Sequence, residues 1–271
     1  LQTIPPEPAV QAKNLSPVRQ ARGICEVVLY SSDHHQTLTT MPLFHIENLI
    51  RVWQDRYCEL GAQEFVKYVF IFENKGEAVG VTLHHPHGQI YAYPYIPPVI
   101  KQEISASQRY YRQHHTCLFC ALVDEELQTQ KRLVFEGEQF VAFVPFFARY
   151  PYEVYLAPKR HRSSLVELTK AERADLALVL KALLQKYDYL FDFSFPYIMA
   201  IHQAPTDGGY YPDYHLHFEF YPPHRTAKKL KYLAGSEAGA GSFINDTLPE
   251  EKAAELKALP PADREAVLRL G

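Results

Sequence analysis

Residues 84–90 read His84-His85-Pro86-His87-Gly88-Gln89-Ile90. In an extended segment, side chains two residues apart share a face, so the spacing predicts that His85, His87 and Gln89 address one ligand. Pro86 restricts the residue before it to an extended backbone, and Gly88 lets a phosphate approach the main chain. A neutral imidazole is a good nucleophile near neutral pH. A plain histidine-rich loop or a simple metal site would show the same spacing.

A second version of this stretch closes an internal repeat and reads His215-Leu216-His217-Phe218-Glu219. Each copy holds an apolar strand, a turn ending in a histidine, a helix, a second strand and then the histidine strand. Nearly the same offset separates His34 from His161 as separates His85 from His215. The repeat predicts an α+β fold of two related halves, with antiparallel sheets that join and helices that flank them.

The repeat also fixes the expected elements. The first copy predicts strands over 27–30, 68–72 and 85–89 and a helix over 44–60. The second predicts strands over 154–157, 197–201 and 215–219 and a helix over 170–191. Thr169 and Glu172 resemble a capping box at the start of that second helix.

The two halves differ where chemistry would take place. Glu219 stands where the first copy has Gln89, and the bulky Leu216 and Phe218 replace a proline and a glycine. Bulky residues leave less room for a phosphate. We therefore expect residues 21–100 to form the catalytic half and residues 117–259 to form a structural or metal-binding half.

Composition restricts the class of protein. The chain has 271 residues and a net charge of −3, with no long basic run, which argues against a nucleic-acid partner. No apolar stretch is long enough to span a membrane, and the opening, residues 1–6, is not a signal peptide, so we expect a cytoplasmic protein. The 19 tyrosines and 16 phenylalanines favour a strand-rich core and aromatic-lined pockets.

Two of the four cysteines, Cys117 and Cys120, have the spacing of a zinc knuckle. With His161 and His215 they would complete a Cys₂His₂ zinc site, although a pair of buried thiols would have the same spacing. By symmetry the first half offers His34 and His85 but no CxxC pair upstream of them. Either that site is lost or the sequence before Leu1 is absent, and the low-complexity opening over 5–10 fits a truncated N-terminus.

Further segments give the sequence a specific resemblance. They read Phe72-Glu73-Asn74-Lys75-Gly76, the 85–90 stretch, Ser194-Phe195-Pro196-Tyr197, His202-Gln203-Ala204-Pro205 and Phe220-Tyr221-Pro222-Pro223. Together they resemble the galactose-1-phosphate uridylyltransferase family, a branch of the histidine triad superfamily, over roughly residues 21–259. The resemblance implies a duplicated histidine-triad fold and a homodimer.

The resemblance also implies a reaction. The family exchanges UDP-glucose and galactose 1-phosphate for glucose 1-phosphate and UDP-galactose, by double displacement through a uridylylated histidine. His87 matches that nucleophile and Gln89 the glutamine that binds the phosphoryl group. Asn74 and Thr82 match further phosphate contacts, Thr82 in place of a serine, although Asn74 would also serve as a turn residue.

A C-terminal segment matches the family's sugar-phosphate contacts through Lys231 and Glu237. Ser236 replaces a tyrosine of the better-known pattern, which puts the second substrate in doubt. Lys231 also fits an ordinary surface lysine among its basic neighbours.

The resemblance implies metal sites as well. Family members carry zinc on two cysteines and on histidines that match His34 and His85. Relatives that act on ADP-sugars carry a later zinc site that matches the Cys117 set. A second site, suited to iron or zinc, would be formed by Glu103, His202, His217 and Glu219, with Glu219 replacing a histidine. A hydrogen-bonded core network would give the same residue set.

Two other functions stay open. A related nucleotidyltransferase or phosphorylase would use the same His87 on ADP-glucose or a dinucleotide. A non-catalytic nucleotide-binding module or zinc scaffold would keep the fold alone, but the intact His85, His87 and Gln89 set argues against it.

Overall fold

The structure is a computed structural model that describes residues 15–16, 18, 20 and 22–260. The low-complexity opening over residues 1–10 lies outside the described residues. The main elements of the first half are β1 (Ile24–Leu29), α1 (Leu43–Gly61), β2 (Tyr68–Lys75), β3 (His87–Tyr93) and α2 (Pro98–His114). Those of the second are α3 (Leu118–Thr129), β4 (Leu133–Glu136), β5 (Phe140–Phe143), β6 (Val154–Pro158), α4 (Lys170–Leu190), β7 (Tyr197–His202) and β8 (His217–Tyr221). The chain continues through β9 (His224–Thr226), β10 (Lys229–Leu230), α5 (Gly235–Ala240) and α6 (Pro249–Ala258), and two short 3-10 turns cover Glu77–Val79 and Leu165–Glu167.

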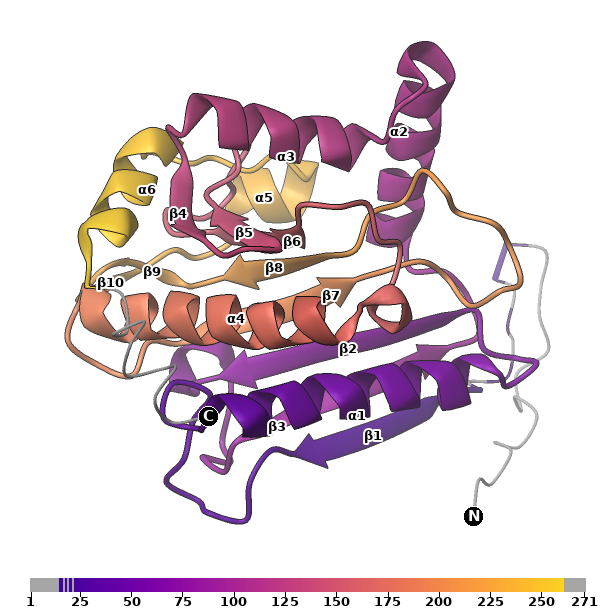
Figure 1. The fold of residues 1–271 in the computed structure, drawn as a ribbon, viewed down its shortest axis with the longest axis horizontal. Helices are drawn as coiled ribbons and strands as arrows, with labels where there is room; N and C mark the ends of the chain where they lie inside the picture. The colour runs from indigo at the N-terminus through magenta and orange to yellow at the C-terminus, as the bar shows by residue number, and fades with distance from the viewer. Residues whose placement is uncertain (1–14, 17, 19, 21, 261–271) are drawn as a thin grey trace.

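Both halves contribute to one eight-stranded sheet. Its order is β1-β3-β2-β7-β8-β6-β5-β4, and every neighbouring pair is antiparallel. The two halves meet where β2 pairs with β7, and the order on either side of that junction is mirrored (Figure 1). The prediction of a duplicated α+β fold with joined antiparallel sheets is therefore confirmed.

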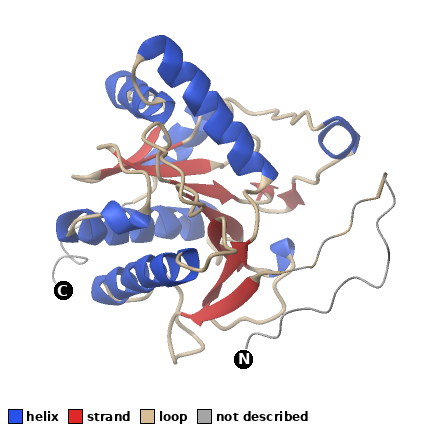
Figure 2. Cartoon of the chain, turned by 90° about the vertical axis from the view of Figure 1, so that its right-hand side faces the viewer, coloured by secondary structure: helices blue, strands red, loops and turns tan. Residues whose placement is uncertain are grey.

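Helices α1 and α4 lie side by side across one face of the sheet (Figures 1 and 2). The inward face of α1 carries Ile46, Ile50 and Trp53, each fully buried at helical spacing. Helix α4 begins at the predicted capping box, in which Thr169 accepts from the Glu172 backbone N–H and the Glu172 side chain accepts in return. Helices α2 and α3 lie on the other side of the sheet, above its second half in Figure 1.

The histidine strand of the first half begins later than predicted. Strand β3 starts at His87, so His85 lies outside the sheet. Pro86 explains the boundary because it has no N–H to donate to a ladder, and its carbonyl instead accepts from the Tyr30 backbone N–H at 3.0 Å. His87 and Gln89 still share a face, as alternation along β3 requires. The predicted strand over 85–89 therefore begins two residues too early, and that His85, His87 and Gln89 address one ligand stays a prediction.

Strand β2 is longer than predicted and extends through Glu73, Asn74 and Lys75. These residues pair with Met199, Ile198 and Tyr197 of β7, so they sit on the junction between the halves. None of the helices in the described part of the chain combines the length and apolar character needed to cross a bilayer.

Candidate active site and metal centres

His87 is held in one orientation at the start of β3. Its Nδ1 lies 2.6 Å from the carbonyl oxygen of His85, to which an Nδ1–H can donate. A proton on Nδ1 leaves the lone pair of the neutral imidazole on Nε2. His217 has the same arrangement in the second half, with Nδ1 2.9 Å from the His215 carbonyl oxygen. The repeat therefore preserves the backbone geometry of both histidines.

A pocket of about 120 Å³ opens beside His87. Its wall includes His85, Glu73, Asn74 and Lys75, so the end of β2 and the start of β3 form it together. Gln36, Thr37, Leu38, Gly76, Val81, Leu83, His84, Pro86 and Ser194 complete the lining. Of the predicted phosphate contacts, Asn74 thus shares a pocket with His87.

The remaining predicted substrate contacts lie apart from this wall. Gln89 is on the His87 face of β3 and accepts a hydrogen bond from Tyr91 Oη at 3.2 Å. Thr82 is exposed in the loop before β3 and is not in the pocket lining. Lys231 and Glu237 follow β10, and neither lines the pocket. Their roles in substrate binding stay predictions.

Lys231 and Glu237 contact one another. Lys231 Nζ lies 3.2 Å from Glu237 Oε1 and also donates to the Ile244 carbonyl oxygen. Backbone N–H groups, first that of Glu237 itself and then that of Ile244, lower the pKa of Glu237 to about 2. The pair therefore presents a fixed carboxylate and ammonium rather than two independent surface charges.

His34 and His85 face each other in the first half. Their Nδ1 atoms are 2.7 Å apart, and His85 Nε2 is buried without a hydrogen-bond partner among the described residues. No third cysteine, histidine or carboxylate completes a ligand set with them in residues 22–260. The predicted pair is brought together, and its metal binding stays a prediction.

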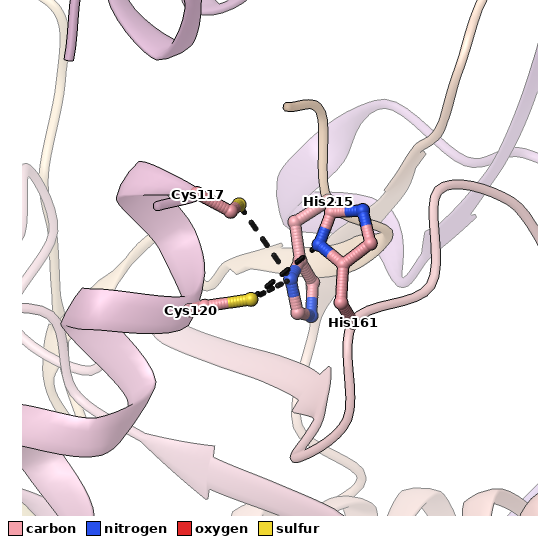
Figure 3. Close-up of side chains that lie close together, drawn as sticks. All are labelled: Cys117, Cys120, His161 and His215. Carbon is pink, nitrogen blue, oxygen red and sulfur yellow. Dashed lines mark hydrogen bonds between the residues drawn. The ribbon is translucent and has the colours of Figure 1, made fainter. Parts of the chain in front are cut away.

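The four predicted ligands of the second half converge (Figure 3). Cys120 Sγ lies 3.4 Å from His161 Nδ1 and 3.3 Å from His215 Nδ1, and Cys117 Sγ lies 4.0 Å from His215 Nδ1. All four ligand atoms are within 4.8 Å of one another. A zinc tetrahedron, with bonds of about 2.3 Å to sulfur and about 2.0 Å to nitrogen, has edges of roughly 3.3–3.8 Å. The distances among the four ligand atoms are close to these edge lengths.

The protonation of His215 and Cys117 suits a cation, whereas hydrogen bonding to Cys117 raises the pKa of both Cys120 and His161. His215 Nε2 donates to the Pro158 carbonyl oxygen at 3.1 Å, which leaves Nδ1 unprotonated and directed at the sulfurs. Burial lowers the pKa of His215, so its imidazole is neutral. A hydrogen bond from Cys120 holds the pKa of Cys117 far below its usual value. A neutral imidazole and a thiolate are the forms in which these side chains bind zinc.

The second predicted cluster also assembles. His202 Nδ1 is 3.0 Å from Glu103 Oε1 and 3.6 Å from Glu219 Oε1, and His217 Nε2 is 3.2 Å from Glu219 Oε1. The four ligand atoms lie within 4.8 Å of one another. Burial alone would lower the pKa of His202, but the Glu219 and Glu103 carboxylates raise it to about 9. The geometry therefore fits either a cation or an imidazolium–carboxylate network.

Two residues that the sequence analysis missed contact this cluster. Arg149 pairs with Glu219 Oε2 at 3.1 Å and with the fully buried Glu153 at 3.0 Å. Tyr214 donates to Glu103 Oε2 at 2.6 Å. Each contact occupies one carboxylate oxygen and leaves the other for the cluster. No spacing signal in the sequence marks either residue, because both contacts join segments that are distant along the chain.

The duplicated α+β fold, with a His-x-His segment at the start of one strand in each half, defines the class: α+β proteins built from two related halves that share one antiparallel sheet. Two family models match the chain, the galactose-1-phosphate uridyl transferase N-terminal domain over residues 2–97 and the C-terminal domain of the same family over residues 103–267. The chain belongs to the galactose-1-phosphate uridylyltransferase family, and the predicted resemblance is confirmed.

Individual relatives agree with this assignment. A galactose-1-phosphate uridylyltransferase of Thermotoga maritima is 47% identical over 255 residues, which cover 92% of this chain and 79% of the relative. A solved uridylyltransferase structure matches with a TM-score of 0.88 at 43% identity, covering 94% of this chain and 81% of that one. An ADP-glucose phosphorylase from Arabidopsis thaliana, solved with bound ADP-glucose, matches with a TM-score of 0.79 at 26% identity, covering 88% and 73%.

Proposed function

We propose that this chain is a UDP-glucose–hexose-1-phosphate uridylyltransferase that works through a covalent intermediate on His87. The observation that carries the proposal is the fixed imidazole, whose Nδ1 is held 2.6 Å from the His85 carbonyl oxygen beside a pocket that contains Asn74 and Lys75. The names of the relatives in the same family support the choice of substrates.

In the first half-reaction, the lone pair of His87 Nε2 attacks the α-phosphorus of UDP-glucose. The Nε2–P bond forms, the bond to the bridging oxygen breaks, and glucose 1-phosphate leaves with that electron pair. The Nδ1 proton stays hydrogen-bonded to the His85 carbonyl oxygen throughout. In the second half-reaction, a phosphate oxygen of galactose 1-phosphate attacks the same phosphorus, and Nε2 recovers its electron pair as UDP-galactose forms.

The chain needs no strong general acid for this exchange, since both leaving groups are good ones, a sugar phosphate and an imidazole. The work of the protein is then positioning and stabilisation of phosphoryl charge. We assign Gln89, Asn74 and Thr82 to the phosphoryl oxygens, and Lys231 with Glu237 to the sugar phosphate. The catalytic role falls to the first half, residues 21–100, and metal binding to the second, residues 117–259.

For the metals, we propose zinc on Cys117, Cys120, His161 and His215, where it would hold α3, the loop after β6 and the start of β8 together. The Glu103, His202, His217 and Glu219 set would take iron or zinc. His34 and His85 would serve a third site only with ligands from outside the described residues. The cysteine-containing set lies entirely in the second half, and the other set joins three residues of that half to Glu103 of α2. Because both sets lie outside residues 21–100, we give them structural roles.

We further propose a cytoplasmic homodimer that binds neither nucleic acid nor membranes. Its net charge of −3 supports the absence of a nucleic-acid partner. Sedimentation velocity across a concentration series would test the dimer.

The activity is tested by incubating the protein with UDP-glucose alone and weighing it intact. We expect an acid-labile uridylyl adduct that galactose 1-phosphate removes and that His87→Ala abolishes. His45→Ala, an exposed histidine of α1, is the matched control and should keep the adduct. A folded, metal-loaded protein that forms no adduct would refute the proposal.

The second candidate is an adenylyl-transferring relative that acts on ADP-glucose. The structural match to the ADP-glucose phosphorylase favours this candidate over a non-catalytic binding module. The same experiment with ADP-glucose decides between the two transferases, because an adenylyl adduct formed faster than the uridylyl adduct would move the protein to this second activity. A non-catalytic module would form no adduct with either nucleotide sugar.

A further inference from the structure

Tyr30, which follows β1, contacts both residues that flank His87. Its backbone N–H donates to the Pro86 carbonyl oxygen at 3.0 Å. Its phenol lies under Gly88, so closely that a Cβ added at Gly88 would be 2.2 Å from Tyr30 Oη. The catalytic imidazole is thus attached to a backbone that Tyr30 holds from two sides.

The phenol of Tyr30 packs against Trp53 and lies beside Glu73. Its ring packs edge-on against Trp53 at 6.3 Å between centroids. Its oxygen and Glu73 Oε2 are both buried, and neither has a well-formed hydrogen-bond partner among the described residues. The other carboxyl oxygen, Glu73 Oε1, accepts from Tyr197 Oη at 3.1 Å. Two phenols, that of Tyr30 after β1 and that of Tyr197 on β7, therefore flank one buried carboxyl group.

Glu73 is only 6% exposed, yet it lines the pocket that contains His87. A carboxylate is an unexpected group in the wall of a pocket that binds phosphates, because like charges at short range repel. A neutral carboxylic acid avoids this repulsion and can donate its proton to the otherwise unpartnered Tyr30 oxygen.

We propose that Tyr30, Glu73 and Tyr197 form a positioning device for the nucleophile, in which Glu73 acts as an uncharged acid that holds Tyr30 beneath the His87–Gly88 backbone. The inference rests on the proposed function and deepens it, since it names how the attacking nitrogen is kept in line. Neither tyrosine is a catalytic residue, because each acts through the backbone of β3 or through Glu73.

The charges around Glu73 are consistent with this role. Burial raises the pKa of Glu73 to about 7, against the opposing effects of Lys75 and the two phenols. Lys75, on the same strand, is already paired with Asp188 of α4 at 3.0 Å. His85 and His87 line the same pocket from the β3 side. Within the described part of the chain, no cation is therefore dedicated to an ionised Glu73.

The test measures the rate of uridylyl-His87 formation in a single turnover with UDP-glucose, from about pH 5.5 to 9. We expect Tyr30→Phe to slow the reaction at least ~10-fold, since misplacement of an attacking atom by about 1 Å costs on the order of 100-fold. Tyr197→Phe should act in the same direction but less. Wild-type rates should fall by about tenfold per pH unit above about 7 as Glu73 ionises.

Glu73→Gln keeps the shape of the side chain and removes its ionisable group. This variant should retain most of the wild-type rate at pH 6 and should not slow down as the pH rises above about 7. Glu73→Ala should lose the rate at every pH. Tyr210→Phe, at an 87% exposed tyrosine, is the matched control for removal of a hydroxyl. If Tyr30→Phe does not fold, the comparison of the pH profiles of wild type and Glu73→Gln still tests the positioning device.

The two proposals fail in different ways. A wild-type protein that forms no adduct overturns the proposed function and this inference with it. A wild-type adduct combined with unchanged rates in Tyr30→Phe and an identical alkaline fall in Glu73→Gln overturns the positioning device alone.

Discussion

Gly88, which follows the proposed nucleophile His87, gives the sharpest test of how closely the proposed active site is packed. In Gly88→Ala, the new Cβ would lie 2.2 Å from Tyr30 Oη, 2.9 Å from Tyr30 Cζ and 3.2 Å from the Phe72 carbonyl oxygen. The Phe72 contact is backbone of the neighbouring strand, and the Tyr30 phenol is confined by Trp53. Either β3 or the Tyr30 ring must therefore move by about 1 Å to restore ordinary contact distances.

The expected cost follows from that displacement. Overpacking of this kind destabilises a core by about 1–3 kcal/mol. A shift of the nucleophile by about 1 Å should slow adduct formation on the order of 100-fold. Urea unfolding measures the first quantity, and single-turnover mass spectrometry with UDP-glucose measures the second.

Two further variants make the reasoning refutable. Gly239→Ala, where no atom lies within 4 Å of the new Cβ, should change neither quantity. In the double variant Tyr30→Phe/Gly88→Ala, loss of the 2.2 Å contact should recover part of the stability lost by Gly88→Ala. Wild-type stability and rate in Gly88→Ala, or no recovery in the double variant, would show that Tyr30 does not confine this backbone.

Three other predictions concern the metal site, the core and pH. Cys120→Ser should lower the zinc bound per chain, measured by elemental analysis, and the melting temperature, whereas Cys58→Ser at an exposed cysteine should change neither. Asp175→Ala should lower the free energy of unfolding, measured in urea, by about 3 kcal/mol or more, because Asp175 accepts from the backbone N–H groups of Glu138, Gln139 and Phe140. The control Glu47→Ala, in a surface ion pair, should lower it by less than about 1 kcal/mol. Because folding raises the pKa of Glu73 from 4.5 to about 7, the folded state holds this proton more tightly. Its contribution to stability is full below pH 4.5 and is lost as the pH rises to about 7, by about 3 kcal/mol in total. Unfolding of Glu73→Gln across this range should lack that loss, and an unchanged pH dependence would contradict the assigned burial of the charge.

The fold was predictable from the sequence where periodicity and the repeat agreed. The buried face of α1 and the capping box of α4 are local signals, and the structure places both within a residue or two of the expected positions. The repeat supplied the long-range step, because it paired histidines that no local pattern connects. The convergence of Cys117, Cys120, His161 and His215 follows from that pairing.

The supports of the active site were not predictable in the same way. The sequence analysis placed Tyr30 in an apolar strand over 27–30, and Glu73 entered it only as part of the segment over 72–76 that resembles the family. Glu73 is buried beside β7 and the Tyr30 hydroxyl is buried beneath Gly88, and only the assembled sheet reveals these positions. His85 was placed on the wrong side of a strand boundary, since the missing N–H of Pro86 outweighs the alternating pattern. Arg149 had no signal because Glu219, its partner in the cluster, lies 70 residues further along the chain.

The comparison of the two halves explains why only one of them should carry a nucleophile. Both imidazoles are anchored by Nδ1 on a carbonyl oxygen two residues earlier. His217, however, has Nε2 engaged by Glu219 at 3.2 Å, and Phe119 stacks on its ring at 4.3 Å between centroids. Because a carboxylate oxygen accepts hydrogen bonds, Nε2 of His217 donates an N–H to Glu219 and offers no lone pair. The availability of that lone pair, rather than the orientation of the ring, distinguishes the halves.

This distinction yields a prediction. Glu219→Gln in a His87→Ala background gives the second half the His-x-Gln pattern of the first. We expect no uridylyl adduct on His217, because the Phe119 ring still covers the imidazole and Leu216 and Phe218 still occupy the positions of Pro86 and Gly88. Peptide mapping after incubation with UDP-glucose provides the measurement. An adduct on His217 would mean that Glu219 alone prevents the second half from reacting. The Phe119 ring and the bulky Leu216 and Phe218 would then have no such effect.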